Sequence, residues 1–79
     1  MEIKILGMGC QRCRMLEQMT YNAAAELDIA ADISKVEDVE KIMSYGVINT
    51  PGLVIDGNLV LSGRLPSFEE LKRILADNQ

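Results

Sequence analysis

Hydrophobic residues change their spacing along the chain, and each change marks a boundary between predicted elements. The apolar run at residues 3–6 ends at Gly7 and Gly9, which predicts a short buried strand followed by a turn. From about Gln11 the apolar positions recur at helical spacing, which predicts a helix with one buried face that ends at Asp28. That face comprises Cys13, Leu16, Met19, Ala23 and Leu27.

The middle of the chain predicts a strand and then a short helix. Residues 30–36 form an apolar stretch with irregular alternation, which favours a second strand. Val39, Ile42 and Met43 then mark one face of a short helix. Gly46 follows as a suitable left-handed residue to end it. Methionine at this spacing usually fills a core, so we expect Met43 to be buried.

Start signals are present for the two later helices. The short helix has two compatible starts: Ser34 in a capping box with Glu37, or Asp38 as a later N-cap. Ser67, with Glu70 three residues on, forms a capping box that opens a last helix.

Between these helices the chain carries its clearest hairpin signal. The apolar triplets LVI and LVL flank Asp56-Gly57, a favoured tight turn between antiparallel strands. The predicted order is therefore β-α-β-α-β-β-α in a single domain over residues 1–79. A β-α-β unit makes its strands parallel and a hairpin adds antiparallel ones. We therefore predict an α/β fold with a four-stranded mixed sheet flanked by helices.

Composition and charge exclude several function classes. The formal net charge is −4 without a basic cluster, which argues against a nucleic-acid partner. Histidine is absent, which excludes His-based catalysis and His-containing metal sites. No segment approaches the roughly 20 apolar residues that span a bilayer, so we expect no membrane association. The N-terminal residues lack a small-residue cleavage site, so we expect a cytoplasmic protein.

Two cysteines, Cys10 and Cys13, are the strongest chemical signal in the chain. A small disulfide-stapled domain would carry more cysteines, and in the cytoplasm such a pair is usually catalytic or metal-binding. The start of a helix favours a thiolate, so Cys10 is the candidate nucleophile. Arg12 adds positive charge between the two cysteines and is expected to tune the thiol pKa. Cys13, one turn later, is the candidate resolving thiol.

These motifs together resemble the thioredoxin/glutaredoxin superfamily, and most closely its small redox-active disulfide proteins of archaea and bacteria. The resemblance covers nearly the whole chain. It is carried by GMGCQRC after the first strand, NTPGLVIDG at residues 49–57 and SGRLPSFEELKRIL near the end. It implies a thioredoxin-like fold in which Pro51 is cis and lies opposite the cysteines. It also implies that Thr50 offers its backbone to an extended substrate chain.

The resemblance implies a thiol–disulfide oxidoreductase that holds no cofactor and no metal. Its expected partners are proteins with disulfides and a separate disulfide reductase that donates electrons, and we expect a monomer. The chain lacks the tryptophan of thioredoxins proper and the double glycine with which glutaredoxins bind glutathione. Glutathione is therefore not expected as its reductant.

A second hypothesis rests on the same cysteines. Gly-Met-x-Cys-x-x-Cys near the start of a short chain is also typical of soft-metal carriers, because two thiolates suit Cu(I). The heavy-metal-associated fold, however, ends in a strand, whereas this chain is predicted to end in a helix. The order of elements therefore favours redox exchange over metal carriage.

Overall fold

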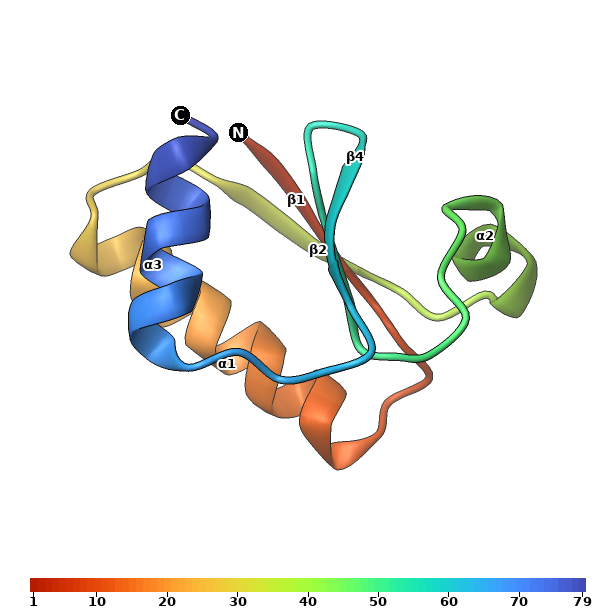
Figure 1. Ribbon diagram of the computed structural model, residues 1–79. Helices are drawn as coiled ribbons and strands as arrows, with labels where there is room; N and C mark the ends of the chain where they lie inside the picture. Colours follow the sequence, from red (N-terminus) through yellow and green to blue (C-terminus); the bar gives the residue numbers. More distant parts are fainter.

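The computed structural model describes residues 1–79, and its elements follow the predicted order (Figure 1). They are β1 (Glu2–Leu6), α1 (Gln11–Glu26), β2 (Asp32–Val36), α2 (Val39–Ser44), β3 (Gly52–Ile55), β4 (Asn58–Ser62) and α3 (Phe68–Asp77). None of the three helices is both long and apolar enough to cross a bilayer.

The four strands form one mixed sheet in the order β2-β1-β3-β4, which confirms the predicted architecture. β1 runs parallel to β2, as the α1 crossover requires, and antiparallel to β3. In the β1–β3 register Leu6 lies opposite Gly52, so β1 ends where β3 begins. The segment after β1 and the segment before β3 therefore meet at the same edge of the sheet.

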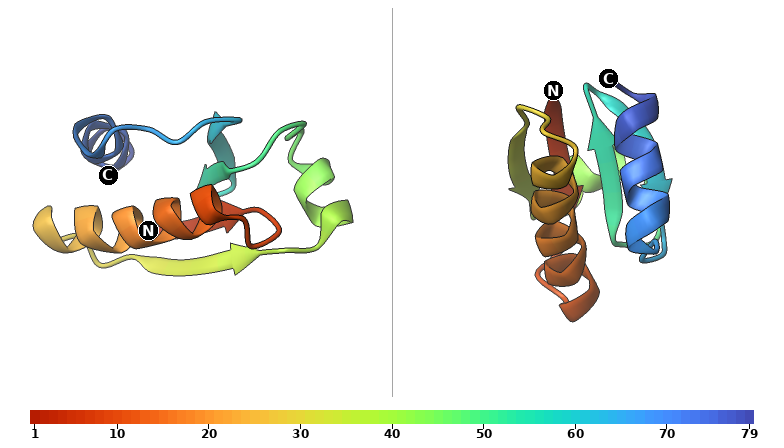
Figure 2. Two further views of the ribbon diagram at one scale, coloured as in Figure 1. Left: turned by 90° about the horizontal axis from the view of Figure 1, so that it is seen from below. Right: turned by 90° about the vertical axis from the view of Figure 1, so that its left-hand side faces the viewer.

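The helices cover the two faces of the sheet unequally. α1 and α3 lie side by side on one face, and α2 lies alone on the other, beyond the end of β2 (Figures 1 and 2). Side chains alternate across β1, so Ile3 and Ile5 enter the main core beneath α1 and α3. Leu6 faces the opposite way and joins a smaller core with Ile42 and Val54.

Local signals explain most of the element boundaries. Asp38 is the N-cap of α2, and its carboxylate accepts the backbone N–H of Glu40 at 3.0 Å. The later of the two predicted starts is therefore correct. Ser67 caps α3 as predicted, accepting the backbone N–H of Glu70 at 3.1 Å. Asp56-Gly57 has φ of 49° and 86°, the two positive values that a type I′ hairpin turn needs.

The expectation that Met43 fills the core is wrong, because its side chain is 65% exposed. α2 has only six residues, and Ile42 is the one buried residue among them. A helix this short buries a single side chain against the sheet, so the apolar residues Val39 and Met43 beside it stay largely exposed.

Replacing Leu71 with Ala tests the packing of α3 on the main core. Leu71 has no exposed surface, and we expect the variant to lose about 2–5 kcal/mol of the free energy of unfolding. Leu59→Ala is the matched control, because Leu59 is 36% exposed on β4 and a partly exposed side chain contributes less. Urea unfolding measures both, and equal losses would contradict the assigned core.

Candidate active site

The turn after β1 places Cys10 at the N-cap of α1, just before its first residue. Gly9 adopts a φ of 79°, a left-handed conformation that side chains disfavour. Cys10 is then the N-cap of α1, and its Sγ accepts the backbone N–H of Cys13 at 3.3 Å. A sulfur in this position lies at the positive end of the helix dipole and beside free N–H groups, which favours its thiolate.

Cys10 and Cys13 lie together but in different surroundings. Their Sγ atoms are 2.6 Å apart, and both cysteines are free thiols. Cys10 is exposed, whereas only 5% of Cys13 is accessible. A protein partner can therefore reach the sulfur of Cys10 directly, while Cys13 is shielded behind it.

The environment moves the two thiol pKa values in opposite directions. The pKa of Cys10 is lowered, mainly by the hydrogen bond from the Cys13 thiol and next by the Cys13 backbone N–H. The pKa of Cys13 is raised, first by its burial and then by its hydrogen bond and charge repulsion with Cys10. Of the two thiols, Cys10 is therefore the one that ionises more readily.

Arg12 is not the main cause of the lowered Cys10 pKa. Its backbone N–H and its guanidinium charge both lower the pKa of Cys10, but they rank behind the Cys13 hydrogen bonds. Arg14 has a different role, since its guanidinium donates to the carbonyl oxygen of Gly9 and braces the turn before Cys10. A tuning effect of Arg12 stays a prediction.

Gly7 provides the space in which the Cys13 sulfur sits. A Cβ at this position would lie 2.2 Å from Sγ and 3.1 Å from Cβ of Cys13, far inside van der Waals contact. Gly7 is buried and does not have a positive φ, so the backbone itself would accept a larger residue. Glycine is required here because Cys13 packs directly on the end of β1.

The residues predicted to border the substrate groove lie opposite Gly7. The Thr50–Pro51 peptide bond is cis, as the resemblance implied. Pro51 is buried, and its carbonyl accepts the backbone N–H of Gly63 at 2.9 Å, which ties this loop to the end of β4. The side chain of Thr50 lies near Cys13 and acts to lower the pKa of the Cys13 thiol. The structure thus brings Thr50 and Pro51 to the cysteine pair.

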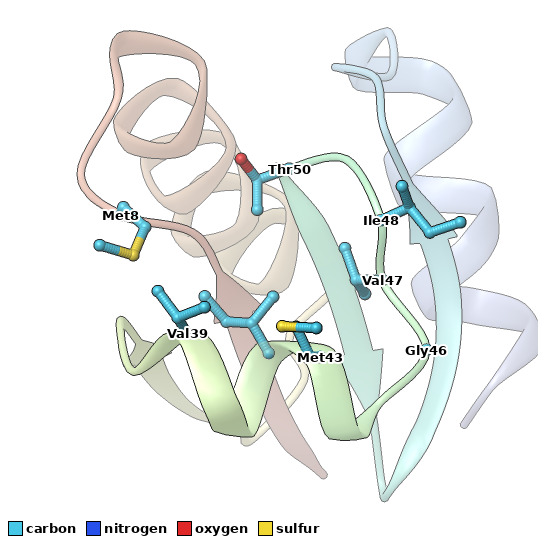
Figure 3. A pocket seen from close by; sticks show the side chains of 8 residues that line it. Met8, Val39, Met43, Gly46, Val47, Ile48 and Thr50 are labelled. Carbon is cyan, nitrogen blue, oxygen red and sulfur yellow. The ribbon is translucent and has the colours of Figure 1, made fainter.

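Beside Thr50 the surface opens into an apolar groove of about 410 Å³ (Figure 3). Its lining residues come from the turn after β1, from α2 and from the segment before β3: Met8, Val39, Ile42, Met43, Gly46, Val47, Ile48 and Thr50. The sequence contained a signal for this groove, since Val39 and Met43 are four residues apart and share a helix face. Because the sequence analysis expects Met43 to be buried, it does not predict this groove.

The chain offers few ligands for a metal. No group of three or more His, Cys, Asp or Glu side chains is placed to hold an ion. Among those residue types, a soft metal would find the two thiols of Cys10 and Cys13.

Replacing Cys13 tests which group lowers the pKa of Cys10. Cys13→Ala removes the thiol donor, so we expect the pKa of Cys10 to rise, whereas Cys13→Ser keeps a hydroxyl donor and should raise it less. Because the thiolate reacts, the pH midpoint of Cys10 alkylation by iodoacetamide measures each value, and a raised pKa moves it to higher pH. Arg12→Gln should move the midpoint less than Cys13→Ala. The reverse order would make the guanidinium the main cause.

Gly7→Ala tests the packing of Cys13 against β1. The added methyl group must displace the Cys13 sulfur, so we expect formation of the Cys10–Cys13 disulfide to slow by on the order of 10- to 100-fold. Alkylation of Cys10 in the reduced protein at alkaline pH is the internal control, because Cys10 is ionised there whether or not the Cys13 thiol donates to it. Unchanged disulfide formation would show that Cys13 has room to move.

The comparisons with known proteins agree with this geometry. Residues 1–76 match the family model described as the thioredoxin domain. A search of the curated proteins finds no match. The mixed sheet, the cis-proline and the cysteine pair at the start of α1 lie within the matched residues. The chain therefore belongs to the thioredoxin domain family.

Proposed function

We propose that the protein is a thiol–disulfide oxidoreductase that reduces disulfides of other proteins. The observation that carries the proposal is the asymmetry of the cysteine pair. Cys10 is exposed with a lowered pKa, and Cys13 is buried with a raised pKa. Exchange needs one accessible thiolate that attacks and a second thiol, shielded from other partners, that resolves the product.

The reaction proceeds by two exchanges. The Cys10 thiolate attacks one sulfur of a substrate disulfide, and the other substrate sulfur leaves as a thiolate. Cys13 then loses its proton and attacks Sγ of Cys10, which releases the second substrate sulfur. The substrate gains two electrons from the cysteine pair and two protons, one from Cys13 and one from the solvent, and the protein is left with a Cys10–Cys13 disulfide. No bound cofactor or metal takes part in these steps.

Two further parts of the proposal concern the partners. The backbone of Thr50 and the ring of Pro51 border the site where an extended substrate segment would lie beside Cys10. A separate disulfide reductase or dithiol donor returns the oxidised pair to the thiol form. Such a cycle fits the cytoplasm, where reductases keep thiols reduced.

Trapping of the mixed disulfide tests the assigned roles. We expect Cys13→Ser to accumulate a disulfide between Cys10 and a protein substrate such as insulin, because the resolving thiol is gone. Cys10→Ser should accumulate none, and the wild type should reduce insulin in the presence of a dithiol. Mass spectrometry of the adducts measures the outcome, and adducts on Cys13 of the Cys10→Ser variant would reverse the assignment.

A parallel sample with Cu(I) separates this function from soft-metal carriage. An oxidoreductase forms the Cys10–Cys13 disulfide at a defined potential in a redox titration. A carrier would instead bind one Cu(I) per chain tightly under reducing conditions and show little insulin reduction. That second result would replace the redox function by metal binding.

A further inference from the structure

Lys4 is a charged residue on an inner strand of the sheet. β1 lies between β2 and β3, and Ile3, Ile5 and Leu6 around Lys4 are all buried. Lysine is uncommon in such a place, because its ammonium group must stay hydrated or find a partner. Only 32% of the Lys4 side chain is exposed, so its partners within the protein matter.

The main partner of Lys4 comes from a distant part of the chain. Its Nζ donates to the hydroxyl oxygen of Tyr45 at 3.3 Å, 41 residues later, and lies 3.7 Å from a carboxylate oxygen of Glu2. The hydrogen bond to Tyr45 is also the first cause that raises the pKa of Lys4. Glu2 belongs to the same strand, so Tyr45 is the partner that links β1 to another element.

Tyr45 is the C-cap of α2, where few other contacts hold the chain. Ile42 is the one buried residue of α2. The Tyr45 ring packs on the smaller core that includes Ile42, and its hydroxyl accepts the hydrogen bond from Lys4. Gly46 follows with a φ of 86°, so the chain changes direction there. The Lys4–Tyr45 hydrogen bond therefore fixes the end of α2 on the sheet.

The segment that begins at Tyr45 leads directly to the cysteine pair. It runs from the end of α2 to Thr50, whose side chain lies near Cys13 (Figure 3). Within this segment Val47 is buried, whereas Ile48 is exposed and provides no anchor. The segment is thus held at two points, the Val47 side chain and the Tyr45 hydroxyl. A displacement of Tyr45 would move the start of the loop that carries Thr50.

We propose that Lys4 is a positioning residue for the binding of protein substrates. Through Tyr45 it holds the end of α2 and the loop that carries Thr50, so that this backbone is in place for a substrate segment beside Cys10. The inference rests on the oxidoreductase function proposed above and adds Lys4 and Tyr45 to it. Lys4 is not among the groups that shift either thiol pKa, so its effect is on substrate binding and not on the sulfur chemistry.

Steady-state kinetics of insulin reduction test this role. Lys4→Met keeps the length of the side chain but removes the donor. We expect its KM for insulin to rise about three- to tenfold, the effect of one partly exposed hydrogen bond, with little change in kcat. Lys4→Arg retains a donor and should recover most of this loss. An unchanged KM in Lys4→Met, or a loss that appears in kcat alone, would overturn the proposal.

The partner residue provides a second, milder variant. Tyr45→Phe removes the acceptor but keeps the ring in the smaller core, so it carries the test alone if Lys4→Met does not fold. It should give the same rise in KM. The double variant should give no further rise, because both changes break one contact. Fully additive effects would show that Lys4 and Tyr45 act separately and would contradict the proposal.

Lys72→Met is the matched control. Lys72 is a lysine of α3 that forms ion pairs with Glu26 and Glu69 and none with α2 or the loop after it. Its removal should leave the KM for insulin unchanged. A rise as large as that of Lys4→Met would make the effect one of general stability and overturn the positioning role.

Hydrogen exchange measures the hold on α2 directly. The backbone N–H groups of Tyr45 and Gly46 donate to the carbonyl oxygens of Ile42 and Met43. We expect these two amides to exchange faster in Lys4→Met than in the wild type, because the end of α2 opens more often. Equal exchange rates would contradict the hold.

Wild-type exchange with the small disulfide of 2-mercaptoethanol separates this inference from the function on which it rests. Its absence would refute the oxidoreductase function itself. Its presence, together with an insulin KM that Lys4→Met does not change, would refute only the role of Lys4.

Discussion

The antiparallel pairing of β1 with β3 is the constraint on which the site depends. Its register places Leu6 opposite Gly52, so the turn that leads to Cys10 and the loop that holds Pro51 emerge at one edge of the sheet. A register slip of one residue would turn every side chain of β1 to the opposite face and separate the two segments. The chemistry therefore depends on a backbone ladder formed by strands that contain no reactive residue.

Different degrees of burial give the two cysteine side chains different chemical properties. Cys10 lies at the solvent-exposed start of α1, while Cys13 is one turn further in, against the end of β1. The same residue type thus acquires opposite pKa shifts from its position, through hydrogen bonding at Cys10 and burial at Cys13. The difference in pKa between Cys10 and Cys13 therefore comes from helix geometry and packing.

Local patterns in the sequence were sufficient for the fold and for part of the site. Periodicity located the seven elements, Asp56-Gly57 located the hairpin, and the cysteine spacing located the pair. The need for glycine at position 7 was not predictable, because the atom that excludes a side chain belongs to Cys13, which only the tertiary fold brings there. The exposure of Met43 was missed for a related reason, since periodicity predicts a face but not whether a partner covers it.

The capping of α1 by Cys10 has a consequence beyond reactivity. The sulfur that accepts the Cys13 N–H in the reduced protein is the same sulfur that forms each new covalent bond in the proposed exchange. A thiolate accepts such a hydrogen bond more strongly than a disulfide sulfur does, because it carries the charge. Each turnover of the proposed reaction would therefore also weaken and restore the capping of α1. The backbone amide of Cys13 thereby becomes a built-in reporter whose chemical shift and solvent exchange follow the oxidation state of the pair.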